Sequence, residues 1–83
     1  MKVGVAGSVE SNDVLITVQP AEILTIEITS IVDAFFHDQI EKVIIDTLKE
    51  FNVGNVKVVC QDKGALDYTI KARLVTALKR MGA

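Results

Sequence analysis

The chain has 83 residues, a formal net charge of −2 and one cysteine. Its 49% apolar and 24% charged residues are typical of a globular chain and argue against disorder. A chain of this length makes a single domain, residues 1–83, with little room for an enclosed active-site cavity. Because no apolar run approaches the roughly 20 residues of a membrane span and residues 1–20 lack a secretory layout, we expect a cytoplasmic protein without membrane contact.

The first predicted unit is a β-hairpin. Residues 3–9 and 14–19 are apolar enough to form strands, and the polar run at residues 10–13 between them is typical of a tight turn. Gly4 and Gly7 weaken a strand interior, so the first arm is predicted to be an irregular or edge strand.

The turn predicts a register for this hairpin. With Ser11 and Asn12 as a two-residue loop, Glu10 pairs with Asp13 and Val9 pairs with Val14. Two like charges then lie opposite each other, which costs about 1 kcal/mol or less. The same register predicts one apolar face that is shared by both arms: Val3, Val5, Val9, Val14, Ile16 and Val18. Ser11 is predicted to lie in water at the hairpin tip.

Residues 22–30 form the clearest predicted strand. Leu24, Ile26 and Ile28 alternate with polar residues, which indicates one buried and one exposed face. Residues 31–36 fit either an extension of this strand or the start of the next helix.

A helical period begins at about Asp38. The pair of Asp38 and Glu41 has the form of a capping box, and Asn52 and Gly54 are residue types that end helices. The apolar residues recur at helical spacing: Phe36, Ile40, Val43, Ile44, Leu48 and Phe51.

Residues 55–61 alternate again and predict a fourth strand, and the turn at residues 62–67 leads into a second helix. The inner stripe of this helix is apolar: Leu66, Ile70, Leu74, Ala77, Leu78 and Met81. The order is β-β-β-α-β-α. We therefore predict an α+β fold, a mainly antiparallel four-stranded sheet with both helices packed on one face.

Few residues suggest chemistry on their own. Cys60 lies on the apolar side of its strand and is interpreted as a buried structural thiol, which fits a reducing compartment. His37 is the one histidine and has no companion at ligand spacing, so no metal site is predicted. A stand-alone enzyme that uses Ser11 or Cys60 lacks a convincing partner base.

Charge is uneven along the chain. Residues 1–50 hold nine acids and three bases, net −6, whereas residues 51–83 hold two acids and six bases, net +4. Most bases of the second part lie on the second helix: Lys71, Arg73, Lys79 and Arg80. Such a basic stripe is usually a solvated face, so nucleic acid is a weak candidate partner. A small nucleic-acid or protein-binding module remains as a second interpretation.

Two motifs together carry a family resemblance. Residues 5–14 (VAGSVESNDV) and 62–67 (DKGALD), followed by residues 72–74 (ARL), closely resemble the acyl carrier (gamma) subunit of citrate lyase. The resemblance extends through nearly the whole chain and includes residues 51–53 (FNV) and the spacing between the motifs.

The resemblance implies a function. In that family, the serine after the glutamate of the first motif carries triphosphoribosyl-dephospho-coenzyme A through a phosphodiester, and the matching residue is Ser11. The carrier takes acetyl and citryl thioesters between an alpha subunit, which exchanges acetyl for citrate, and a beta subunit, which releases oxaloacetate. The implied partners are these two subunits and the transferase that attaches the group, and the carrier itself is not an enzyme.

The residues next to Ser11 are predicted to have recognition roles. We expect Glu10 and Asp13 to be recognised by the transferase, or to keep the attached group extended from an acidic surface. Asn12 stands where relatives are expected to have glycine or another small residue, and Asn still permits a positive φ. The carriers of citramalate lyase and malonate decarboxylase are the alternatives within this kind of protein.

Overall fold

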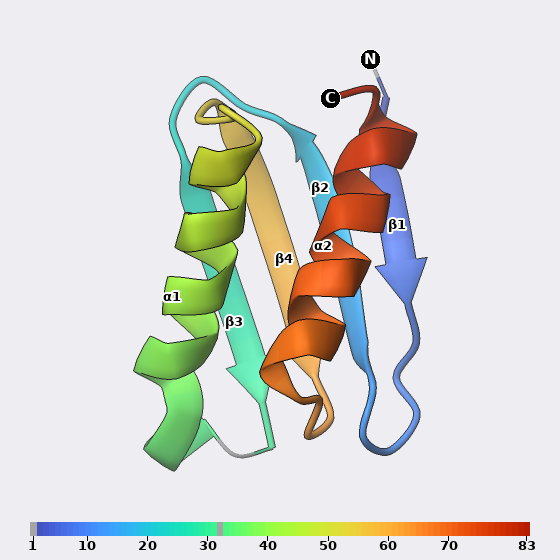
Figure 1. Cartoon of the computed structure of the whole chain (residues 1–83), viewed down its shortest axis with the longest axis vertical. Coiled ribbons are helices and arrows are strands. Elements are labelled where there is room, and N and C mark those ends of the chain that lie inside the picture. Colours follow the sequence, from blue (N-terminus) through green and yellow to red (C-terminus); the bar gives the residue numbers. More distant parts are fainter. Residues whose placement is uncertain (1, 32) are drawn as a thin grey trace.

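A computed structural model describes residues 2–31 and 33–83, and residues 33–35 through their backbone alone. The elements follow the predicted order: β1 (Gly4–Gly7), β2 (Val14–Pro20), β3 (Thr25–Ser30), α1 (Asp33–Glu50), β4 (Val56–Asp62) and α2 (Asp67–Met81). Figure 1 shows both helices on the same face of the sheet, as predicted. Among the described residues, no helix has the length and apolar character needed to cross a membrane.

The four strands lie in the order β1-β2-β4-β3. β2 pairs antiparallel with both β1 and β4, whereas β3 pairs parallel with β4, so the sheet is mainly antiparallel but mixed. The parallel pair follows from the connection, because α1 carries the chain from the end of β3 back to the start of β4.

The core lies between the sheet and the two helices. The central strands β2 and β4 supply alternate residues that are fully or almost fully buried, including Cys60, which is 0% exposed. Burial, with a smaller contribution from Asp62, raises the pKa of the Cys60 thiol to about 12. The prediction of a buried structural thiol is therefore confirmed.

The predicted register of the hairpin is wrong by one residue. Gly4 lies opposite Val18 and Ala6 opposite Ile16, and the Val14 carbonyl accepts a hydrogen bond from the Ser8 amide (3.2 Å). Because neighbouring residues point to opposite faces of a sheet, this shift turns the valines of the first arm outward. Val3, Val5 and Val9 are 52%, 43% and 53% exposed, and the buried positions of β1 are Gly4 and Ala6.

The close approach of α2 explains this register. A Cβ atom on Gly4 would lie 1.8 Å from the Ala77 carbonyl oxygen, so a valine has no room between β1 and the helix. Gly7 has a φ of +97°, and a Cβ there would lie 1.8 Å from the Val14 carbonyl oxygen. Gly4 therefore lets β1 pack directly under α2 at the edge of the sheet, and Gly7 lets the end of β1 approach the backbone of β2 closely.

The first helix starts where the sequence left two alternatives open, and the predicted capping box is wrong. α1 begins at Asp33, within the segment that the sequence left ambiguous, so Asp38 and Glu41 lie inside the helix and form no capping box. The end is as predicted, because Asn52 has a φ of +58° and the Val53 amide bonds to the Leu48 carbonyl oxygen (2.9 Å).

Candidate functional site

Ser11 lies in a tight turn at the end of the first hairpin. The Asp13 amide donates a hydrogen bond to the Glu10 carbonyl oxygen (3.1 Å), which makes Ser11 and Asn12 the two central residues, as predicted. Asn12 has a φ of +66° whereas Ser11 does not have a positive φ, a pattern typical of a type II turn. The prediction that Asn12 permits a positive φ is therefore confirmed.

The turn is attached to the loop between β4 and α2. The Asn12 amide donates to the Lys63 carbonyl oxygen (2.8 Å), and the Lys63 amide donates to the Asp13 carbonyl oxygen (2.9 Å). Gly64, with a φ of +92°, comes next, and a Cβ there would lie 3.6 Å from Asn12 Oδ1. The two sequence motifs, at residues 5–14 and 62–67, thus meet at one end of the molecule (Figure 1).

Asp13 ties the turn to α2. Its Oδ2 accepts from Ser8 Oγ (2.7 Å), its Oδ1 accepts from the Val14 amide (2.7 Å), and the Arg73 guanidinium donates to both oxygens (3.1 and 3.0 Å). The hydrogen bond from Arg73, followed by those from Ser8 and Val14, lowers the pKa of Asp13 from 3.8 to about 2. The carboxylate is therefore ionised and fully engaged at neutral pH.

The two acids next to Ser11 lie in different environments. The Asp13 side chain is 17% exposed and paired with Arg73, whereas Glu10 is exposed. The charge repulsion expected from their pairing is relieved, because the charge of Asp13 is directed to Arg73 on α2. Glu10 is thus the acid of this pair that is open to solvent.

Two serines occur within four positions of one another, and the structure distinguishes them. Ser8 is partly buried, and its hydroxyl donates to Asp13 Oδ2 and accepts from the Glu10 amide (3.3 Å). Ser11 is exposed, and within residues 2–31 and 33–83 its side chain takes part in no hydrogen bond. Only the Ser11 hydroxyl of this pair is presented to a reagent in solvent.

Asp62 shapes the loop that supports the turn. It is 2% exposed, and its Oδ1 accepts from the Ala65 amide (2.9 Å) while its Oδ2 accepts from Ser30 Oγ (2.7 Å). The buried carboxylate fixes the path of the chain on either side of Lys63. Sequence reasoning missed both Asp62 and Arg73 as supports of Ser11, and complementary charge was the one available signal for Arg73.

The other sequence candidates lie outside this site. His37 Nε2 lies 3.8 Å from a Glu41 carboxylate oxygen, and the described residues contain no group of three His, Cys, Asp or Glu side chains placed to hold a metal. In the basic stripe, Lys71 pairs with Glu50 (3.0 Å) and Arg80 donates to the Val5 carbonyl oxygen (2.7 Å). Together with the pairing of Arg73, these contacts show that three of the basic side chains bind groups of this same chain.

Comparisons with known proteins agree on one kind of protein. Residues 1–81 match the acyl carrier family model described as malonate decarboxylase delta subunit, MdcD. The citrate lyase acyl carrier protein of Streptococcus mutans is 49% identical over 78 residues, which cover 92% of this chain and 76% of that protein. That of Treponema denticola is 47% identical over 76 residues, which cover 92% of this chain and 87% of that protein.

The fold also occurs in a solved structure, a Pseudomonas malonate decarboxylase hetero-tetramer in complex with malonate. One chain of it superposes with a TM-score of 0.83 at 18% identity, covering 98% of this chain and 84% of that one. At this identity the likeness concerns the fold alone.

The matching family model and the names of the relatives define the class, which is an acyl carrier protein, a non-catalytic subunit. The chain belongs to the acyl carrier family of the malonate decarboxylase delta subunit and citrate lyase type.

Proposed function

We propose that this chain is the acyl carrier subunit of a citrate lyase and holds triphosphoribosyl-dephospho-coenzyme A through a phosphodiester to Ser11. The group would supply a thiol on which acetyl and citryl groups travel between the transferase (alpha) and lyase (beta) subunits. The observation that carries the proposal is the exposed Ser11 hydroxyl at the centre of a hydrogen-bonded turn. The thiol of Cys60 cannot carry the acyl groups in place of the attached group, because Cys60 is 0% exposed.

The residues at the turn fit a covalent attachment. Ser11 offers an oxygen that can form a phosphodiester without breaking a hydrogen bond of the chain, and the turn leaves room on its solvent side. The Arg73 guanidinium balances the charge of Asp13, so this carboxylate adds less repulsion toward an anionic linker. The Asn12 amide donates to the Lys63 carbonyl oxygen and the Lys63 amide donates to the Asp13 carbonyl oxygen, and these two bonds hold the attachment point while the group moves.

Distinct roles for the flanking residues follow from their environments. Glu10 is exposed and is proposed to be recognised by the attaching transferase. Asn12 supplies the positive φ of the turn, and Asp13 holds the turn against α2. Asp13 is proposed to contribute to recognition through the shape that it gives the turn. A cytoplasmic location is also proposed, as expected from the sequence.

Malonate decarboxylase is the second candidate complex. It is favoured by the description of the matching family model and by the hetero-tetramer that shares the fold. The citrate lyase proposal is preferred because relatives named for citrate lyase are 49% and 47% identical, against 18% for the malonate decarboxylase chain. In both candidate complexes the chain is a carrier within a multi-subunit enzyme.

Mass spectrometry of the chain from its own cells tests the attachment. We expect a nucleotide-containing adduct that tandem fragmentation localises to Ser11. Ser11→Ala abolishes it, whereas Ser8→Ala, the matched control in the same loop, retains it. An adduct that moves to Ser8, or an unmodified chain from cells that make the other subunits and the attachment enzymes, would contradict the proposal and favour the binding-module interpretation.

A further inference from the structure

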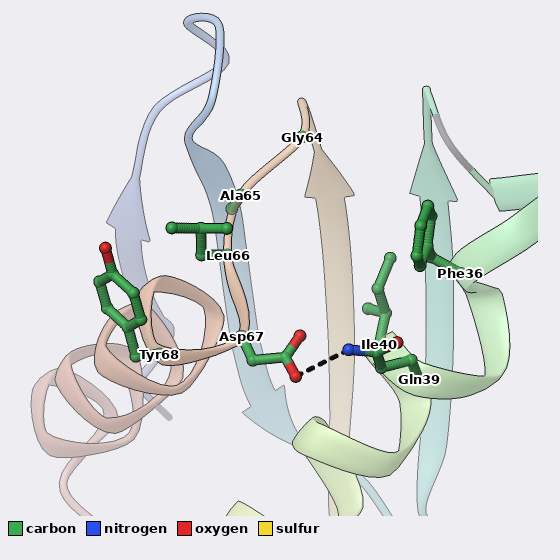
Figure 2. Close-up of a pocket in the computed structure, with 8 residues that line it drawn as sticks. All are labelled: Phe36, Gln39, Ile40, Gly64, Ala65, Leu66, Asp67 and Tyr68. Carbon is green, nitrogen blue, oxygen red and sulfur yellow. Dashed lines mark hydrogen bonds between the residues drawn. The ribbon is translucent and has the colours of Figure 1, made fainter.

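A groove of about 470 Å³ lies between the first turns of α1 and the start of α2. Figure 2 shows Phe36 and Ile40 on the α1 side, and Leu66 and Tyr68 on the α2 side. Phe36, Leu66 and Tyr68 are 47%, 59% and 72% exposed, so the groove is lined by apolar side chains that the fold leaves uncovered. Its volume is in the range of small-molecule sites, and its lining is mostly apolar, as such sites are.

The turn between β1 and β2, which contains Ser11, lies at the same end of the molecule as the loop between β4 and α2 (Figure 1), and residues of that loop line the groove. Gly64 lines it, and the preceding Lys63 exchanges backbone hydrogen bonds with Asn12 and Asp13. A Cβ atom on Gly64 would lie 3.6 Å from Asn12 Oδ1, which places the border of the groove against the residue after Ser11. A flexible group attached to Ser11 therefore starts beside this groove.

Two polar side chains cross the groove. Gln39 Nε2 donates to Asp67 Oδ2 (2.8 Å), and Figure 2 shows these side chains pointing toward one another. An amide of a ligand can replace this bond, because its N–H donates to the Asp67 carboxylate and its carbonyl accepts from the Gln39 amide. The combination of apolar walls and one exchangeable donor and acceptor suits a long, uncharged chain that contains amides.

We propose that this groove is a resting site for the pantetheine part of the group attached at Ser11. The inference rests on the proposed function, which supplies a group with a thiol-terminated, amide-containing chain. Tethering raises the local concentration of that chain to about the mM range, so even a weak site is occupied for much of the time. Partner subunits then compete with the groove for the thiol.

The groove also discriminates between cargoes. The Asp67 carboxylate and the apolar walls disfavour an acyl group that bears carboxylates, because its charges would lose water without gaining a partner cation. The uncharged thiol and a small uncharged acyl group are accepted. A citryl cargo keeps two free carboxylates, because its third carboxyl group forms the thioester. It is thus held outside the groove, where a partner enzyme can reach it.

Alkylation of the thiol of the attached group by iodoacetamide, followed by intact mass, tests this proposal on the modified chain. Cys60 does not interfere, because it is 0% exposed and is the one cysteine of the chain. Leu66→Asp removes an apolar wall, and it spares the fold because Leu66 is the N-cap of α2 and makes no side-chain cap, a role that Asp fulfils. Ile23→Asp, at an apolar residue that is 76% exposed at the other end of the molecule, is the matched control.

We expect Leu66→Asp to speed alkylation by about two- to tenfold. This range applies when the Kd of the groove for the tethered chain lies between the effective concentration of that chain and about a tenth of that concentration. Ile23→Asp reacts at the wild-type rate. Equal rates for all three chains would overturn the inference, even with the adduct present on Ser11. Equal rates together with slower turnover by the partner subunits in Leu66→Asp would instead assign the groove to protein docking.

A second measurement separates this inference from the attachment itself. Free pantetheine is titrated into the unmodified chain and followed by amide chemical shifts, which requires no adduct. We expect saturable shifts at Ile40, Ala65 and Tyr68 that Leu66→Asp weakens and Ile23→Asp does not. A chain without an adduct on Ser11 refutes the proposed function, whereas the absence of shifts in this titration refutes the groove.

Discussion

The two connections at opposite ends of β2 are held very differently. Residues 8–13, the tip, are bound by backbone bonds to Lys63, by the carboxylate of Asp13 and by Arg73. Residues 21–24, the far loop, are held by the bond from the Ala21 amide to the Asn55 carbonyl oxygen (2.9 Å), and Thr25 Oγ1 donates to the Ile23 carbonyl oxygen (3.2 Å). Both connections are exposed.

This difference shows which exposed loop the fold supports. The far loop joins two strands and leaves Ile23 76% exposed, and its Ala21 amide bonds to Asn55, which lies between α1 and β4. The tip forms hydrogen bonds with the loop after β4, with α2 and within its own turn, and these bonds involve Asn12 and Asp13 next to Ser11. A site that must keep its position while a long group moves needs such support from rigid elements.

The contact between β1 and α2 should give the largest effect on stability. Gly4→Val places a side chain against the Ala77 carbonyl oxygen and is expected to lower the free energy of unfolding by about 3 kcal/mol or more. Gly54→Ala, near the far loop, meets no atom within 4 Å and is expected to change it by less than about 0.5 kcal/mol. Urea denaturation measures both, and equal effects would refute the close packing of β1 under α2.

The bond between Arg73 and Asp13 should matter for attachment. Arg73→Gln frees the tip from α2 and is expected to slow attachment of the group by about tenfold, because the hydroxyl is less well positioned. Arg73→Lys restores this only in part, since an ammonium cannot donate two parallel bonds. The control is Lys71→Gln, which removes a cation of the same helix that pairs with Glu50. Attachment at the same rate in Arg73→Gln and Lys71→Gln would contradict the role of the tip.

A smaller effect is expected at Asn12. Asn12→Ala keeps the backbone bond to Lys63 but places an alanine at a φ of +66°, which costs about 1 kcal/mol. Asn12→Gly is expected to stay within about 0.5 kcal/mol of the wild type, because glycine adopts this conformation freely. Thermal or urea unfolding distinguishes the two. If Asn12→Gly lowers the free energy of unfolding as much as Asn12→Ala does, the Asn12 side chain, and not its backbone conformation, supports the turn.

The pH dependence should give the smallest effect. The pKa of Asp13 is lowered from 3.8 to about 2 in the folded chain, so its contribution is complete above the unfolded value and is lost as the pH falls toward the folded value. The difference in urea midpoint between the wild type and Asp13→Asn should hold from pH 7 to about 5 and shrink by about half at pH 3. A difference that is constant down to pH 3 would show that Asp13 does not act through its charge.

Much of the fold could be predicted from the sequence because it depends on local patterns. The alternation in residues 22–30 and 55–61 identifies β3 and β4, and helical spacing identifies both helices. Asn12 and Asn52 both adopt the positive φ that their residue type allows. Burial of Cys60 follows from its position on the apolar side of a strand.

The rest depends on distances between segments that no local pattern contains. The alternation of valines in residues 3–9 predicted the wrong face, because the closeness of α2 admits Gly4 and Ala6 and excludes valine. The tie between Asp13 and Arg73 joins residues 60 positions apart, and either charge alone is typical of a solvated surface. Ser11 was identified through the motif around it, whereas its support from Lys63 and Asp62 required the tertiary structure.

The most direct test of the account is the acyl load on the attached group. The chain is isolated from cells that are using citrate and analysed by tandem mass spectrometry before and after treatment with neutral hydroxylamine, which cleaves thioesters. We expect an acetyl or citryl mass on the Ser11 adduct that hydroxylamine removes and that Ser11→Ala lacks. An adduct that never bears a hydroxylamine-sensitive acyl group in such cells, or an acyl group that persists in Ser11→Ala, would contradict a carrier function at Ser11.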